Sequence, residues 1–173
     1  MNTINDLNIK DYFLKKLDLS GKKLDSMQGI EKFKDVEFLY LGGNNIRKIE
    51  GLEELKNIQE LELDFNCIEY IENIQNLTKL KILDLSGNKI NKIKNISTLL
   101  NLEYLDLSEN KISKIENLNY LSMLNTLNLE HNKIEKIENV NELDNLEFLI
   151  VTGNPIPKYI ENIKDSFQII FDD

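Results

Sequence analysis

One nine-residue pattern recurs seven times along this chain, always 22 residues after its previous copy. The clearest copy is Leu102–Asn110, with leucine at its first, fourth and sixth positions and asparagine at its ninth. The seven copies begin at Leu14, Val36, Ile58, Leu80, Leu102, Leu124 and Leu146. A period that never changes predicts one structural unit per repeat, with each unit stacked on its neighbours in a continuous array.

The first half of each repeat has the periodicity of a β-strand. In the fifth repeat, apolar and polar residues alternate over Tyr104–Leu107, which places Leu105 and Leu107 inside and Tyr104 and Asp106 outside. Every repeat returns in the same direction, so we expect the strands to be parallel.

The second half of each repeat has apolar residues at every third position, for example Ile112, Ile115, Leu118 and Leu121. This spacing favours 3₁₀ turns, in which side chains at i and i+3 eclipse. Too few residues remain before the next strand for a full α-helix. The sequence therefore predicts an α/β-type solenoid, a right-handed superhelix with a parallel concave sheet of about seven strands and a convex side of 3₁₀ segments and turns.

The ninth position of the repeat is expected to form a buried column. An amide side chain donates and accepts hydrogen bonds, so it satisfies backbone groups where the strand ends and the chain turns. Lys22 occupies this position in the first repeat. The column consists of Asn44, Asn66, Asn88, Asn110, Asn132 and Asn154.

The pattern divides the chain into three parts. Residues 1–13 precede the first copy and are expected to cap the array, and residues 14–157 form the seven repeats. In residues 158–173 the three-residue spacing fails. Apolar residues then fall at near-helical spacing, which predicts a capping helix or turn-helix over Lys158–Phe171.

Composition narrows the class of partner. The formal net charge is −9, which argues against nucleic acid and is compatible with a basic protein partner. Cys67 is the only cysteine, so no internal disulfide forms. Residues 1–13 lack the apolar stretch of a signal peptide, and no apolar run is long enough to span a membrane. We expect a monomer in the cytoplasm or nucleus.

No catalytic constellation is visible. Cys67 and His131 lie in different repeats, and no phosphate-binding loop or zinc motif occurs. Glu60, Glu62 and Asp64 lack a folded-back loop that would supply the oxygen ligands of Ca²⁺. The sequence therefore predicts a non-enzymatic protein with neither cofactor nor metal.

The outward positions of the strands form the candidate binding surface. They combine aromatic and acidic residues on a rigid sheet, a composition typical of protein-binding hot spots. Asp84 and Asp106 also fit a second interpretation, as template residues kept by duplication, and His131 fits an ordinary surface histidine. The candidate partner-binding residues are Phe38, Tyr40, Glu62, Asp64, Phe65, Asp84, Tyr104, Asp106, Glu130, His131 and Phe148.

The opposite, convex side is predicted to be an ordinary solvent-exposed face. Lysines recur there beside glutamates, so charges of both signs alternate. The lysines are Lys48, Lys92, Lys114 and Lys136.

The nine-residue pattern is that of leucine-rich repeats. The 22-residue period and the triplets at Ile71–Asn73, Ile115–Asn117 and Ile137–Asn139 resemble the subfamily of protein phosphatase 1 regulatory subunit 7 and its relatives. That resemblance implies a protein-binding concave face and a phosphatase-regulating role. Bacterial internalins share the 22-residue period, so an internalin-like surface or effector adaptor is the alternative.

Overall fold

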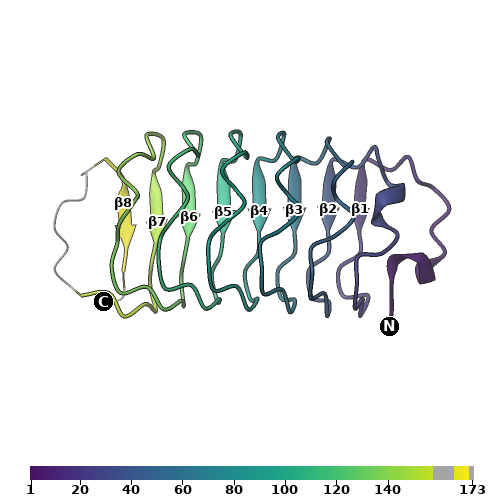
Figure 1. Cartoon of the computed structure of the whole chain (residues 1–173), viewed down its shortest axis with the longest axis horizontal. Coiled ribbons are helices and arrows are strands. Elements are labelled where there is room, and N and C mark those ends of the chain that lie inside the picture. The colour runs from purple at the N-terminus through teal and green to yellow at the C-terminus, as the bar shows by residue number, and fades with distance from the viewer. Residues whose placement is uncertain (158–165, 172–173) are drawn as a thin grey trace.

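A computed structural model describes residues 1–157 and 166–171 of this chain. In this part of the chain eight short parallel strands form one sheet, in which each strand pairs with the next in sequence (Figure 1). The prediction of a repeat solenoid with a parallel sheet is confirmed, with eight strands where about seven were expected. The strands are β1 Lys16–Asp18, β2 Phe38–Tyr40, β3 Glu60–Glu62, β4 Ile82–Asp84, β5 Tyr104–Asp106, β6 Thr126–Asn128, β7 Phe148–Ile150 and β8 Gln168–Ile170.

The strand register follows the period of the sequence. Residues 22 apart lie side by side, so Tyr104 stands between Ile82 and Thr126, and Leu105 pairs with Leu83 and Leu127. The last pair departs from this rule, since Phe148 pairs with Gln168, only 20 residues later. Equivalent positions of successive repeats therefore form straight columns across the sheet from β1 to β7.

The convex side consists of turns closed by hydrogen bonds of the 3₁₀ type. In the fifth repeat the Leu121 N–H donates to the Leu118 carbonyl at 2.9 Å, and the Leu124 N–H donates to the Leu121 carbonyl at 3.0 Å. Among the described repeats, only the first extends such a turn into a 3₁₀-helix, η2 Ile30–Lys32. The expected convex side is thus confirmed.

The core lies between the sheet and the convex turns and runs without interruption through the stack. Leu105 and Leu107 from the strand half, and Ile112 and Ile115 from the turn half, are all fully buried. Each repeat contributes the same layer of leucine and isoleucine, so every layer covers the apolar faces of its two neighbours. The predicted register of inward and outward strand residues is correct for these leucines.

The asparagine column joins successive repeats as predicted. The amide nitrogen of Asn110 donates to the carbonyls of Leu107 at 3.1 Å and Ser108 at 3.0 Å in its own repeat. It also donates to the Leu85 carbonyl of the preceding repeat at 2.9 Å, while its oxygen accepts from the Ile90 N–H at 2.9 Å. Asn110 is only 8% exposed, so these groups have little access to water. The same bonds recur at every other asparagine of the column.

A second series of asparagines forms hydrogen bonds between successive repeats on the convex side. The sequence pattern did not predict this role. The amide nitrogen of Asn117 donates to the Ile93 carbonyl of the preceding repeat at 2.7 Å. Its backbone takes a φ of 61°, in the left-handed region that asparagine tolerates better than most residues. Equivalent bonds, each of 2.7 Å, are made by Asn73, Asn95 and Asn139. These residues include the asparagines of the Ile-Glu-Asn triplets, which are therefore structural.

The N-terminal segment packs against the first repeat. A short 3₁₀-helix, η1 Ile4–Leu7, places Ile4 in the core with 3% of its surface exposed. The Asp25 N–H donates to the Asn2 carbonyl at 2.7 Å, and the Asn5 N–H donates to the Gln28 carbonyl at 3.3 Å. On these contacts we propose that residues 1–13 cap the array.

The C-terminal prediction needs a correction. A capping helix or turn-helix was expected over Lys158–Phe171, but Gln168–Ile170 form the strand β8, which extends the sheet instead. The near-helical spacing of apolar residues misled the prediction because Ile169 and Ile170 are both half-buried in a strand at the end of the sheet. The remainder of the expected helix, residues 158–165, lies outside the described residues.

We expect Asn110→Ala to lower the free energy of unfolding by about 1–3 kcal/mol, because it leaves buried backbone groups without partners. Asn110→Asp is also expected to destabilise, since a carboxylate accepts but does not donate. Urea denaturation at neutral pH measures both effects. Asn91→Ala, at an exposed position of the preceding repeat, is the control. An Asp variant as stable as the wild type would contradict the donor role of the column.

Candidate partner-binding surface

The sheet presents two outward columns of side chains. The first column contains Phe38, Glu60, Ile82, Tyr104, Thr126 and Phe148, and the second contains Tyr40, Glu62, Asp84, Asp106, Asn128 and Ile150. Adjacent strands lie about 4.8 Å apart, so neighbours within a column are in direct reach of each other. The register therefore brings the predicted residues of β2 to β5 together on one face.

This face is strongly one-sided in charge. No lysine or arginine occurs in the two columns from β2 to β7. None occurs either at the seventh and eighth positions of the nine-residue pattern, which lie in the turn after each of these strands. The same positions carry Glu60, Glu62, Asp64, Asp84, Asp106, Glu109 and Glu130. At the β1 end, the Lys16 ammonium lies 4.6 Å from the centroid of the Tyr40 ring. The protein thus already places one cation against an aromatic ring of this surface.

Burial, and after it the crowding of like charges, raises the pKa of the central carboxyl groups. Burial, together with the neighbouring Glu60, Asp64 and Asp84, raises the pKa of Glu62 to about 7. Burial is also the main cause that raises the pKa values of Asp64 and Asp84, and the Asp106 carboxylate adds to both. The charge on this surface therefore opposes folding, and a cation bound here would relieve the repulsion.

Asp106 is not the exposed contact residue that the sequence predicted. It belongs to the outward column but is only 7% exposed. One carboxylate oxygen accepts from the Tyr104 hydroxyl at 3.1 Å and from the Asn128 amide nitrogen at 2.8 Å. The other accepts from the Ser108 N–H at 2.8 Å and from the Ser108 hydroxyl at 2.6 Å. Asp106 thus holds the hydroxyl of Tyr104 in place. The alternation of residues along the strand could not reveal that neighbouring side chains bury Asp106.

Tyr104 remains half-buried on the surface with its hydroxyl tied to Asp106. Burial, the Asp106 charge and this hydrogen bond raise the pKa of Tyr104 to about 12. The ring is thus neutral at physiological pH and has a fixed orientation.

The turn after each of the strands β1 to β7 contains a left-handed residue, which sets the edge of the surface. Gly21, Gly43, Gly87 and Gly153 occupy this position in four repeats, with φ between 63° and 69°. Phe65, Glu109 and His131 occupy it in the others, with φ of 47°, 53° and 51°. Side chains other than glycine are strained in this region, and such strain concentrates at functional sites.

Two of these residues lie over glycines of the next repeat. A Cβ atom on Gly87 would stand 2.6 Å from Cδ1 of Phe65, and a Cβ on Gly153 would clash with the His131 ring. The small residue leaves room for the larger one, and the Phe65 ring is nevertheless 56% exposed. Phe65 thus presents a large apolar surface beside Asp64 and Asp84.

The other predicted residues divide into two groups along the sheet. Phe38, Tyr40, Glu62, Asp64 and Asp84 are half-buried and lie together on the strands and turns of β2 to β4. Three more residues belong to the repeats of β6 and β7. There the imidazole of His131 lies 3.5 Å from the Glu130 carboxylate, and Phe148 is 38% exposed.

Sequence reasoning missed a groove at the other edge of the strands. It has a volume of about 440 Å³, and its lining includes Ile82, Tyr104, Met123 and Thr126. The available signal was two apolar residues at positions that the repeat leaves to solvent, Ile82 in the outward column and Met123, which is 48% exposed. The groove adjoins the acidic surface through Tyr104.

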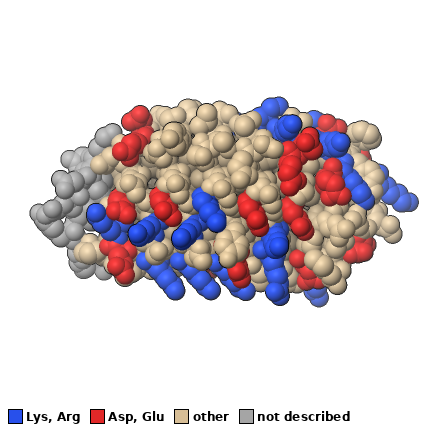
Figure 2. All heavy atoms as spheres, in the orientation of Figure 1, with Lys and Arg blue, Asp and Glu red and all other residues tan. Residues whose placement is uncertain are grey.

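Charges of both signs are mixed elsewhere on the molecule. On the side seen in Figure 2, basic and acidic side chains are mixed over the lower half, whereas the upper middle is largely uncharged. The convex Lys92, Lys114 and Lys136 are exposed, and the Lys136 ammonium lies 3.4 Å from the Glu138 carboxylate. The charge asymmetry is thus a property of the concave face.

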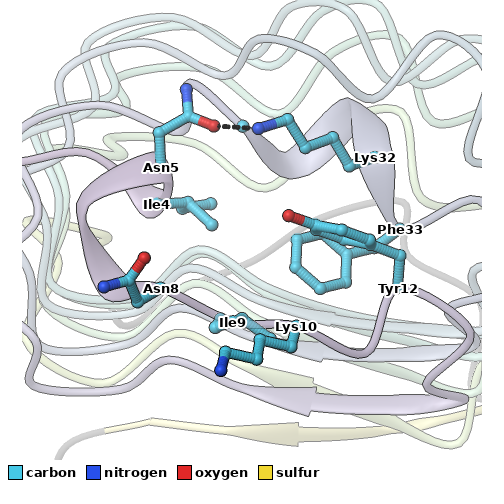
Figure 3. A pocket seen from close by; sticks show the side chains of 9 residues that line it. Ile4, Asn5, Asn8, Ile9, Lys10, Tyr12, Lys32 and Phe33 are labelled. Carbon is cyan, nitrogen blue, oxygen red and sulfur yellow. Dashed lines mark hydrogen bonds between the residues drawn. The ribbon is translucent and has the colours of Figure 1, made fainter.

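A second hollow lies between the N-terminal segment and the first repeat. It has a volume of about 280 Å³ and is lined by Ile4, Ile9 and the paired rings of Tyr12 and Phe33, whose centroids are 5.2 Å apart (Figure 3). The Lys32 ammonium donates to the Asn5 side-chain oxygen at its rim. This hollow lies at the contact between the proposed N-terminal cap and the first repeat, away from the concave columns.

The described residues contain neither a cluster of metal-binding side chains nor a membrane-spanning helix. Nowhere in this part of the chain do three His, Cys, Asp or Glu side chains come together as a metal site would need. Within residues 1–157 and 166–171, no helix has the length and apolar character required to span a bilayer.

We expect Asp106→Ala to lower the free energy of unfolding by about 1–3 kcal/mol, because four donor groups on three residues lose a buried acceptor. Chemical denaturation measures the loss. Asp18→Ala is the matched control, since Asp18 has the same column position in β1 but is exposed. Equal losses for the two variants would show that burial does not distinguish these aspartates.

We expect Glu62→Gln to stabilise the protein more at pH 7.5 than at pH 5. The pKa of about 7 in the folded protein exceeds the ordinary value of 4.5. The folded state therefore holds the proton more tightly, and wild-type stability falls as the pH rises from 4.5 to 7. Urea unfolding at the two pH values tests this, with Glu69→Gln as a control on the same repeat. A stability difference between wild type and Glu62→Gln that is independent of pH would contradict the crowding argument.

Comparison with protein families gives two overlapping matches. A model described as leucine-rich repeat matches residues 62–165, and a model of the leucine-rich repeat domain of the endo-beta-N-acetylglucosaminidase EndoS matches residues 5–110. A search of curated proteins found no match.

Three of the solved structures with a similar fold come from two bacteria. Internalin C2 of Listeria monocytogenes is 25% identical with a TM-score of 0.70, covering 91% of this chain and 80% of the internalin. An internalin, InlF, of the same species is 25% identical with a TM-score of 0.75, covering 87% of this chain and 47% of its own. A leucine-rich repeat protein of Leptospira interrogans is 30% identical with a TM-score of 0.68, covering 84% of this chain and 44% of its own.

The chain thus spans four fifths of one of these proteins and less than half of the other two. The leucine-rich repeat model alone covers more than half of this chain, and the structure repeats the corresponding strand and turn in register. This chain belongs to the leucine-rich repeat family.

Proposed function

We propose that this protein is a non-enzymatic interaction module that binds a protein partner on the concave face of its sheet. The observation that carries the proposal is the segregation of charge on that face. Acidic side chains gather around Glu62 beside the exposed ring of Phe65, and lysine and arginine are absent from the same positions of β2 to β7.

A partner with a basic patch fits this surface best. Opposite charge steers the encounter and speeds association, while aromatic rings supply the desolvated contact that slows dissociation. A cation against Glu62, Asp64 and Asp84 would also offset the burial and the repulsion that raise their pKa values. The unbound protein carries the unfavourable free energy of these crowded carboxylates. Its relief on binding would add to the affinity for the partner.

Two specific roles remain proposals. An internalin-like bacterial surface or effector adaptor is supported by the similarity to two internalins and to a Leptospira repeat protein. Regulation of protein phosphatase 1 rests only on the sequence resemblance, and the triplets that carry it have a structural explanation in the convex asparagines. The first role is therefore favoured. A location in the cytoplasm or nucleus and a monomeric state stay predictions.

Affinity capture from the source cell, followed by mass spectrometry, identifies the partner. Surface plasmon resonance at two salt concentrations then compares variants. Phe65→Gly is expected to fold normally, because glycine occupies the equivalent left-handed position in four other repeats. It is expected to raise the dissociation rate, since the exposed ring is lost. Glu62→Lys and Asp84→Lys are expected mainly to slow association and to weaken its salt dependence.

The control for this prediction is the triple change of Lys92, Lys114 and Lys136 to Glu on the convex face. It alters charge on side chains that are all exposed, so the array should fold normally and bind the partner unchanged. Loss of binding in this convex variant, with the concave variants unaffected, would assign the partner to the other face.

A further inference from the structure

The groove beside Tyr104 has a composition suited to one kind of side chain. It lies where β4, β5 and β6 begin, and it is open to solvent along the concave face. Its floor and walls are apolar and aromatic, from Ile82, Met123 and the Tyr104 ring. Its volume of about 440 Å³ falls within the range of roughly 300–1,000 Å³ for ligand-binding pockets.

The charged part of the groove is acidic, and the neutral polar residues Asn125, Thr126 and Asn145 complete its lining. Glu103 and Glu147 both line it, and among the described lining residues none is a lysine or arginine. The Glu103 carboxylate lies 3.0 Å from the ammonium of Lys81, which is outside the lining. Glu147 is exposed and forms no ion pair with any described residue. A cation entering the groove therefore meets the carboxylate of Glu147, which pairs with no described cation, and that of Glu103, which it would share with Lys81.

The aromatic wall is held rigidly in place. The Tyr104 hydroxyl donates to Asp106, which is itself 7% exposed and accepts three further hydrogen bonds from Asn128 and Ser108. A ring fixed by a buried network needs no reordering when a ligand stacks on it, which lowers the entropic cost of binding. The ring of Tyr104 is thus a preorganised surface on which a planar group can stack.

We propose that this groove is the anchor pocket of the concave face and that it takes an arginine side chain of the protein partner. This inference rests on the proposed function and names the residue that the partner must present. The aliphatic stem lies along Ile82 and Met123, the guanidinium stacks on Tyr104, and Glu147 and Glu103 accept its hydrogen bonds.

Arginine fits this lining better than lysine does. The guanidinium is planar, stacks on aromatic rings and donates several hydrogen bonds in a fixed fork, whereas the ammonium of lysine is a compact and strongly hydrated charge. A purely apolar side chain would fill the floor but leave the carboxylates facing an uncharged group. Citrulline keeps the shape of arginine without the charge, so it separates shape from electrostatics.

The test uses small amides as probes of the full chain. Nα-acetyl amides of arginine, lysine, citrulline and norleucine are titrated into labelled protein, and amide and methyl NMR shifts are followed. We expect the arginine probe to bind most tightly and to shift signals of Ile82, Tyr104 and Met123. Glu147→Gln and Tyr104→Leu are each expected to weaken its binding about two- to fivefold, the size of an exposed cation–aromatic or ion-pair contact.

Glu69→Gln is the matched control, because it removes one exposed carboxylate of the array away from the groove. Norleucine binding as tightly as arginine would overturn the proposal in favour of an apolar pocket. Arginine-induced shifts confined to Glu60, Glu62 and Asp64 would place the cation elsewhere, and equal binding of citrulline would remove the role of charge.

Failure here is distinguishable from failure of the proposed function. If the captured partner loses affinity for the Phe65 and Glu62 variants while the arginine probe ignores the groove, only the anchor pocket is wrong. If the convex triple variant loses the partner while the probe still enters the groove, the face assignment is wrong.

Discussion

The structure depends on the hydrogen bonds that the asparagine column makes between successive repeats. Asn110 links the carbonyls of its own turn to a carbonyl and an N–H of the preceding repeat. Because the amide is buried, a slip of one residue would leave both its own groups and those backbone groups without partners. This penalty fixes the stacking at 22 residues, and the leucine layers then provide the bulk of the burial.

A fixed stacking register has a direct consequence for the concave face. It places every outward side chain beside the equivalent one of the next repeat, so charges that lie 22 residues apart in sequence become neighbours. Burial, together with these neighbouring charges, raises the pKa of Glu62 to about 7. The core and the asparagine column supply enough stability to tolerate it, which leaves the outward positions open to binding a cationic partner.

The Ile-Glu-Asn triplets show why a sequence resemblance overstated function. They fit the pattern of a particular subfamily, yet their isoleucines lie in the core and their asparagines satisfy the convex carbonyls at a left-handed position. In the first two repeats glycine fills the same left-handed position, at Gly29 and Gly51, so this position serves the turn of the repeat. The residues that distinguish this chain are instead those that depart from the repeat, such as Phe65, where four other repeats have glycine, and Met123 at the groove.

The sequence by itself determined the parallel solenoid, the inward leucines such as Leu105 and the asparagine column. All three follow from the strict period, because every repeat places the same types of residue at the same positions. Only the tertiary structure decided that Asp106 is buried under Tyr104 and Asn128, that the chain end at Gln168–Ile170 is a strand, and that Phe65 takes a left-handed turn. Periodicity gives the direction of a side chain, whereas its burial depends on the particular neighbours that stacking places around it. At the end of the array, pairing with β7 outweighs the local spacing that predicted a helix.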